Sequence, residues 1–227
     1  FLQTHPDSRA VELAKAQCGA LRRYMDGSRG KSYVSPIDSR EAPPASLVNV
    51  KFIACMPKNF SRHHLDEIQS SPENSYFLSE KTDGVRHLLV FTGKTAVLLD
   101  RKMERGKQPK PRPGSNLAQD PMAPVLSLIR PGTVLDGEVV LHRKLRRPIF
   151  IVFDVLTLST TQPILHLPFE QRLHHLKRAS FRTEKADCDM FADSAVADPK
   201  VALPLVRKNF VSRFGLDDLL SRVTEER

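Results

Sequence analysis

Residues 80–91 read Glu-Lys-Thr-Asp-Gly-Val-Arg-His-Leu-Leu-Val-Phe, so a lone lysine, Lys81, lies just before an apolar run. The run and the preceding Tyr-Phe-Leu-Ser at 76–79 have the composition of β-strands. Asp83-Gly84 between them is a common turn dipeptide, because glycine supplies backbone freedom and aspartate bonds local amides. We therefore expect Lys81 on a tight turn between two strands, either as a nucleophile or as an ordinary solvated lysine.

Two further stretches have strand character, residues 134–141 and residues 149–156. Successive side chains of a strand point to opposite faces, so Asp136 and Glu138 are predicted to share one face, about 7 Å apart. Paired acids on a sheet need cations as partners.

Strict alternation in the second stretch places Phe153 on the same face as Val155 and opposite Asp154. On that face Phe153 either fills the core or forms an aromatic wall for a purine.

The rest of the chain predicts helices around these strands. Pro6-Asp7-Ser8 opens a helix that ends before Asp26-Gly27 and carries an apolar stripe at three- and four-residue spacing, formed by Val11, Ala14, Cys18, Leu21 and Met25. The remaining expectations are a linker at 26–46, a strand at 95–100, a Pro-rich stretch at 102–132 with a short helix near 122–129, a helix after Pro168 and a helix at 214–223. The predicted fold class is α+β, with antiparallel sheets.

The composition is that of a globular chain of 227 residues, with 40% hydrophobic and 27% charged residues. No apolar run is longer than that from Ile149 to Phe153, which is far shorter than the roughly 20 residues of a membrane span. The chain begins with Phe1, which suggests a processed chain or a fragment. Cys18, Cys55 and Cys188 form no paired motif, which favours reduced thiols over a zinc site.

The formal net charge of +9 predicts attraction to polyanions, with nucleic acid or nucleotide as the natural partner. Positive charge is concentrated in residues 101–112 and in residues 142–147. Each stretch is either a solvated loop or a contact for phosphates of RNA.

Four motifs, in this order, resemble the covalent nucleotidyltransferase superfamily of mRNA capping enzymes and ATP-dependent ligases: Lys81-Thr-Asp-Gly-Val-Arg86, Leu99-Asp-Arg101, Leu135-Asp-Gly-Glu-Val-Val140 and Ile151-Val-Phe-Asp-Val-Leu156. Within it, residues 43–220 resemble the guanylyltransferase of mRNA capping. The resemblance implies an antiparallel-sheet, ATP-grasp-like nucleotidyltransferase domain at 43–227, preceded by an N-terminal helix and linker at 1–42.

The resemblance also implies a reaction. The Lys81 amine attacks the α-phosphate of GTP, and the resulting lysyl-GMP passes its GMP to the 5′-diphosphate end of RNA. An unperturbed lysine is neutral in only about one molecule in a few thousand at pH 7, so nearby positive charge must favour the free amine. The implied nucleotide-binding residues are Thr82, Asp83, Gly84, Arg86, Arg101, Glu138, Phe153 and, from a looser match of residues 203–210, Lys208.

The implied cofactor is Mg²⁺ or Mn²⁺, with Glu138 and Asp136 as candidate ligands. The implied partners are GTP and an RNA 5′ end, with the RNA polymerase II tail or an RNA triphosphatase as further candidates. The implied location is the nucleus, with no membrane attachment.

The resemblance is incomplete. After residue 200 the chain has no Asp-Gly and no Lys-x-Lys pair, so the family's downstream strands and its oligonucleotide-binding domain are not visible. We therefore expect residues 1–227 to be the front part of the catalytic domain, and to form little lysyl-GMP on their own. Two alternatives stay open: an ATP-dependent DNA or RNA ligase, which shares the lysine chemistry, and a non-catalytic RNA-binding relative.

Overall fold

The computed structural model describes residues 8–27, 33–38, 50–93, 95–104, 129–176 and 203–225. The chain divides into two compact units. We call the first, Phe1–Ala54 with Gly84–Arg207, the sheet unit. The second, Cys55–Asp83 with Lys208–Arg227, carries Lys81 and Lys208 and is called the lysine unit.

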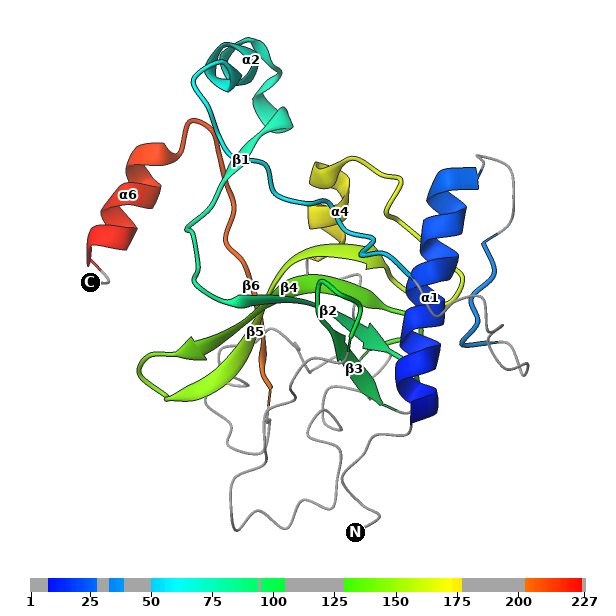
Figure 1. The fold of residues 1–227 in the computed structure, drawn as a ribbon. Helices are drawn as coiled ribbons and strands as arrows, with labels where there is room; N and C mark the ends of the chain where they lie inside the picture. Colours follow the sequence, from blue (N-terminus) through cyan, green and yellow to red (C-terminus); the bar gives the residue numbers. More distant parts are fainter. Residues whose placement is uncertain are drawn as a thin grey trace. The chain divides into compact units, whose positions relative to one another are not determined.

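A five-stranded sheet forms the centre of the sheet unit, with strand order β3-β2-β4-β5-β6 (Figure 1). The strands are β2 (Val85–Phe91), β3 (Ala96–Leu99), β4 (Val134–His142), β5 (Arg147–Thr157) and β6 (Leu205–Arg207). All neighbours pair antiparallel except β5 and β6, which are parallel. The structure confirms the expected mixed α and β content and the antiparallel sheet, whereas β6 was not predicted.

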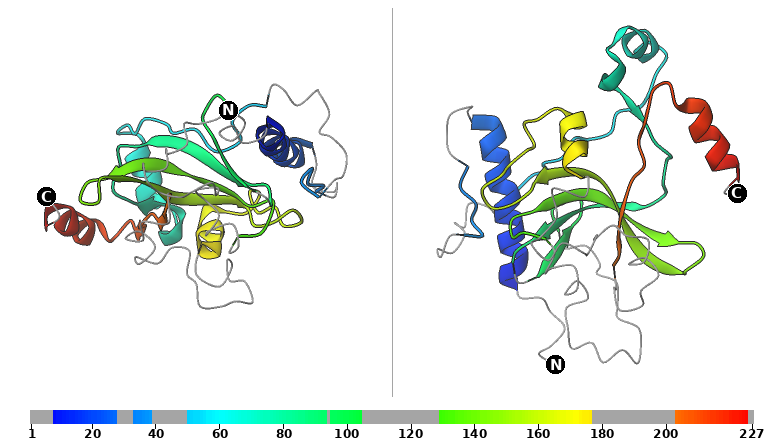
Figure 2. Two further views of the ribbon diagram at one scale, coloured as in Figure 1. Left: turned by 90° about the horizontal axis from the view of Figure 1, so that it is seen from below. Right: turned by 180° about the vertical axis from the view of Figure 1, so that it is seen from behind.

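Helix α1 (Ser8–Gly27) covers one face of this sheet (Figure 2). Most of its predicted apolar stripe is confirmed, since Ala14, Cys18 and Leu21 pack in one buried cluster with Leu88 and Val90 of β2. Met25, at the end of the stripe, is exposed. Burial raises the pKa of the Cys18 thiol to about 12, so this free cysteine is a neutral core residue.

A second core fills the opposite face of the sheet. Leu89 and Phe91, which alternate with the residues that face α1, join Phe150 of β5 in this cluster. Helix α4 (Phe169–His175) packs against the cluster through Leu173. The predicted helix after Pro168 is thereby confirmed.

A β-bulge interrupts the pairing of β4 with β5. Asp136 lies opposite Asp154 and Gly137 lies opposite Val152, so Phe153 is an extra residue in β5. Val152 and Val155, three residues apart, consequently lie in the same core. The prediction that Val155 shares a face with Phe153 is therefore wrong, because it assumed strict alternation through the bulge.

The lysine unit contains a two-stranded antiparallel sheet of β1 (Phe77–Leu78) and β7 (Val211–Ser212). It also holds α2 (His64–Ser70), the short 3₁₀ helix η2 (Glu73–Ser75) and α6 (Leu216–Glu225). Helix α6 confirms the predicted C-terminal helix, with both bounds shifted by two residues. Helix α2 and strand β7 were not predicted.

The expected tight turn at Lys81 is wrong. Residues 79–84 form neither a hydrogen-bonded turn nor a helix or strand. The reason is the pairing: β1 pairs with β7, and β2 pairs with β3 and β4, so no hairpin joins β1 to β2.

Some expectations fall outside the described residues, namely most of the linker at 26–46, the short helix near 122–129 and Cys188. Among the described residues, no helix is both long enough and apolar enough to cross a membrane.

Candidate nucleotide-binding site

The strand register gathers four of the predicted site residues at one end of the sheet unit. Arg86 of β2 lies opposite Glu138 of β4, which lies opposite Ile151 of β5. Phe153 follows two residues later in β5, at the bulge. Arg101 lies two residues beyond the end of β3, at the same end of the β2–β3 pair as Arg86.

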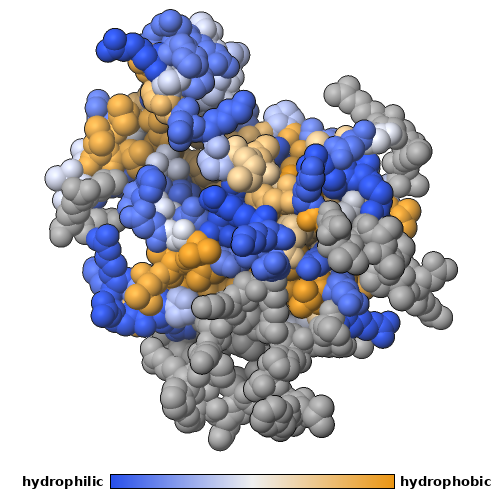
Figure 3. Space-filling view, viewed as in Figure 1, coloured by the Kyte–Doolittle hydropathy of each residue, from blue (hydrophilic) through white to orange (hydrophobic). Residues whose placement is uncertain are grey.

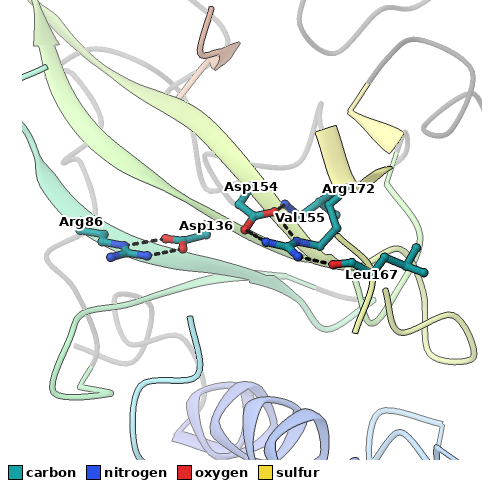
Figure 4. Close-up of polar contacts among 6 residues, drawn as sticks. All are labelled: Arg86, Asp136, Asp154, Val155, Leu167 and Arg172. Atoms are coloured by element: carbon teal, nitrogen blue, oxygen red, sulfur yellow. Dashed lines mark hydrogen bonds and ion pairs between the residues drawn. The ribbon is translucent and has the colours of Figure 1, made fainter. Parts of the chain in front are cut away.

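Arg86 is fixed from three sides. Its guanidinium carbon lies 5.1 Å from the ring centre of Phe52 and 5.2 Å from that of Phe153. Its Nε and Nη2 donate to the two carboxylate oxygens of Asp136, at 3.0 and 2.6 Å (Figure 4). Two cation–π contacts and a bidentate ion pair leave this side chain only 9% exposed. Sequence reasoning did not single out Phe52, because its contact with Arg86 is tertiary.

Asp136 is the anchor for Arg86 and is only 1% exposed. Burial raises the pKa of its carboxyl group from 3.8 to about 6; Arg86 opposes this rise, and Asp154 and Glu138 add to it. The carboxylate is thus a buried group whose charge is balanced chiefly by one guanidinium.

A second buried ion pair lies next to the first (Figure 4). Asp154, the cross-strand partner of Asp136, accepts hydrogen bonds from Nε and Nη2 of Arg172 in α4, at 2.9 and 2.8 Å. Asp154 also accepts the backbone N–H of Val155. This ion pair connects β5 to α4, which explains why a carboxylate is buried at position 154.

The glycines of both Asp-Gly pairs are required by close packing. A Cβ on Gly84 would lie 2.8 Å from Val140 Cγ2 and 2.9 Å from the Val139 carbonyl oxygen. A Cβ on Gly137 would overlap the Ile151 carbonyl oxygen. Neither glycine has a positive φ angle. Backbone freedom, the reason that the sequence suggested for Gly84, is therefore not what this position uses.

The turn after β3 presents Arg101 to solvent. The Asp100 carboxylate accepts the backbone N–H groups of Lys102 and Glu104, at 2.8 and 2.9 Å. The Met103 side chain is buried in the core that faces α1, and this burial anchors the turn on the sheet unit. Arg101 is exposed on this ordered turn.

The lysine unit brings Lys208 to the predicted nucleophile segment. Lys208 Nζ donates to Thr82 Oγ1 at 3.2 Å, although the two residues are far apart in sequence. Lys81 Nζ lies 2.8 Å from Asp83 Oδ1, and these side chains are 88% and 92% exposed. An ion pair so exposed contributes little to stability and is easily exchanged for another partner.

The two carboxylates proposed as metal ligands differ in their surroundings. Both oxygens of Asp136 are already bonded to Arg86, and a cation beside that guanidinium would be repelled. Glu138 is half-buried and lies in the row with Arg86. Among the described residues no cluster of three or more His, Cys, Asp or Glu side chains could hold a metal ion. Glu138 fits an ion that arrives with nucleotide phosphates, which is how proteins commonly bind Mg²⁺.

A sheet that gathers arginine, glutamate and an aromatic ring, in a chain with an exposed lysine segment, has the groups of a nucleotide-binding protein. The chain belongs to the family of the mRNA capping enzyme catalytic domain, which matches residues 46–222. It is similar to the mRNA-capping enzyme subunit alpha of Neurospora crassa, with 26% identity over 185 residues. That match covers 77% of this chain and 43% of the length of the relative.

Proposed function

We propose that the protein is an mRNA guanylyltransferase. The Lys81 amine attacks the α-phosphate of GTP, the bond to the β-phosphate breaks, and pyrophosphate leaves while GMP stays on Nζ. The terminal phosphate of a 5′-diphosphate RNA then attacks the same phosphorus and releases the lysine. The observation that carries this proposal is the register that aligns Arg86 with Glu138, with the Phe153 ring against Arg86, in a chain of the capping-enzyme family.

The surroundings of Arg86 suit a group that must be in place before the reaction. Asp136 and two aromatic rings hold its guanidinium, so little reorganisation is needed when a phosphate or ribose binds. In this proposal Phe153 stacks on guanine with the ring face away from Arg86. Lys208, Thr82 and Arg101 bind the nucleotide, and Glu138 contacts the ribose or the metal.

Mg²⁺ or Mn²⁺ bound with Glu138 and the nucleotide would supply positive charge to the phosphates. The residues of the chain orient the nucleotide. Lys81 leaves its ion pair with Asp83 and contacts the α-phosphate instead.

We further infer a nucleotidyltransferase domain of the ATP-grasp-like type at 43–227, a nuclear location and a partner subunit. The name of the relative, which includes "subunit alpha", motivates the partner, for which an RNA triphosphatase or the RNA polymerase II tail is the candidate. Cell fractionation and co-purification check the last two points. A protein that is absent from nuclei and purifies alone would contradict them.

The test is covalent labelling with α-labelled nucleotides, using the protein at its natural length with Mg²⁺ or Mn²⁺. We expect label from GTP, and not from ATP, to survive denaturation. Lys81→Met should abolish the label. Lys58→Met, which removes another exposed lysine of the same unit, should not. Label from ATP alone would indicate an ATP-dependent ligase. Equal labelling of both variants would exclude Lys81 as the nucleophile.

A further inference from the structure

The β4–β5 hairpin extends beyond the rest of the sheet. β4 pairs with β2 only as far as Val139, opposite Val85, and β5 meets β6 only from Phe150 onward. Residues 140–149 therefore pair only with each other among the described strands. Figure 1 shows them as a two-stranded ribbon that projects from the sheet, and we call this segment the basic arm.

The tip of the basic arm concentrates positive charge. Four cationic side chains lie within five residues: Arg143, Lys144, Arg146 and Arg147. The first three are exposed, and none of them takes part in an ion pair among the described residues. The sequence has no Asp or Glu between Glu138 and Asp154. Such a tip attracts polyanions, and the arm's own sequence supplies no carboxylate.

The turn that carries these cations is ordered by hydrogen bonds to one residue. The His142 carbonyl oxygen accepts the N–H of Arg146 at 2.8 Å, and His142 Nδ1 accepts the N–H of Leu145 at 3.2 Å. Arg146 adopts a φ of 50°, which lets the chain reverse within four residues. The backbone that presents the cations is thus defined before any ligand arrives. On the surface seen in the view of Figure 1, hydrophilic and hydrophobic side chains lie side by side (Figure 3).

The basic arm is a direct continuation of the candidate site. Strand β4 carries both Glu138 and the arm, and the five residues from Glu138 to Arg143 span about 17 Å of extended chain. At the spacing of one strand of B-DNA, about 3.4 Å per nucleotide, this distance corresponds to about five stacked nucleotides.

We propose that the basic arm binds the phosphate backbone of the acceptor RNA, about five nucleotides downstream of its 5′ end. This inference rests on the proposed guanylyl transfer, in which Arg86 and Glu138 bind the nucleotide that reacts with the RNA 5′ end. Cations on a projecting strand pair also prevent edge-to-edge aggregation, and the experiment separates that role from RNA binding.

The experiment compares the wild type with an arm variant, Arg143→Gln/Lys144→Gln/Arg146→Gln, and with a control of equal charge, Arg23→Gln/Lys58→Gln/Arg62→Gln. All six side chains are exposed. We expect the arm variant to form lysyl-GMP at the wild-type rate. Its KM for a 20-nucleotide diphosphate RNA should rise about tenfold at moderate salt, and its binding should depend less steeply on salt, by about 2 in the log–log slope. Its KM for a diphosphate dinucleotide should not change, because a dinucleotide does not reach the arm.

Three results would overturn the proposal. These are an unchanged KM for the long RNA, an equal rise in the control variant, and an equal rise for the dinucleotide. Unchanged RNA affinity with faster aggregation would assign the charges to edge protection alone. Affinity for the same RNA is also measured by fluorescence anisotropy. A wild type that binds RNA through the arm but forms no lysyl-GMP would contradict the proposed function and not the RNA contact.

Discussion

Arg86 illustrates what a single residue of this site depends on. Its identity follows from the Lys-Thr-Asp-Gly-Val-Arg motif, but its position depends on Asp136, Phe52 and Phe153. Buried ion pairs of this kind are costly to break, because removal of one partner leaves an unpaired charge. Asp136 therefore holds the Arg86 side chain in its position.

Asp136 predicts a pH dependence of stability. The pKa of its carboxyl group is raised in the folded protein to about 6, so the folded state holds this proton more tightly than the unfolded chain does. The resulting stabilisation is present below about pH 4 and is lost as the pH rises through about 6. Relative to Asp136→Asn, the wild type should lose about 2 kcal/mol of unfolding free energy between pH 4 and pH 7.

Urea denaturation of both proteins across this range checks the prediction. NMR titration of the Asp136 carboxyl group in the wild type checks it without a variant. A difference between the two proteins that does not change with pH, or an Asp136 that titrates near pH 4, would contradict it.

Phe153 predicts a separation of nucleotide affinity from stability. Because the ring is half-buried and lies against Arg86, Phe153→Ala should weaken GTP binding by about 1–3 kcal/mol, the range for base–aromatic stacking. The stability loss should stay below the roughly 3–5 kcal/mol of a fully buried phenylalanine. Phe52→Ala is the matched control, because it removes the other ring on Arg86.

Calorimetric titration with GTP and a thermal melt on each variant provide both quantities. Equal losses of GTP affinity in the two variants would mean that Phe153 acts only through Arg86. A large stability loss with unchanged GTP affinity would show that Phe153 is a core residue and does not stack on guanine.

At the scale of elements, strands β2 and β4 could be predicted almost to the residue from their composition. The bulge at Phe153 could not, because the register of β5 is set by its partner strand and not by local sequence. Strands β6 and β7, with three and two residues, are too short to show a period, whereas β1 was predicted at 76–79. Local turn chemistry favoured a turn at Lys81. No such turn forms, because β1 pairs with β7 and not with β2.

The pair of Asp154 with Arg172 predicts how α4 is held on the sheet. Arg172→Met should cost about 3–5 kcal/mol of stability, because it leaves a buried carboxylate without its partner. The double variant Asp154→Asn/Arg172→Met should be less destabilised than the sum of the single variants. A double-mutant cycle by chemical denaturation measures the coupling, and strictly additive losses would show that the pair does not hold α4.

At the scale of the whole molecule, sequence motifs predicted the family, but they did not predict which residues touch. Four of the predicted residues, Arg86, Glu138, Phe153 and Arg101, lie at one end of the sheet, and Lys208 lies against Thr82 in the lysine unit. The contacts of Arg86 with Phe52 and Asp136 depend on tertiary packing and carry no local signal.

The central claim is that Lys81 carries the nucleotide, and its most direct test is to find the modified residue. The protein at its natural length is incubated with GTP and a divalent metal, digested at alkaline pH, at which a phosphoramidate survives, and sequenced by mass spectrometry. The account predicts GMP on Lys81 and on no other lysine. GMP on Lys208 or elsewhere, or a wild-type protein that stays unmodified, would contradict it.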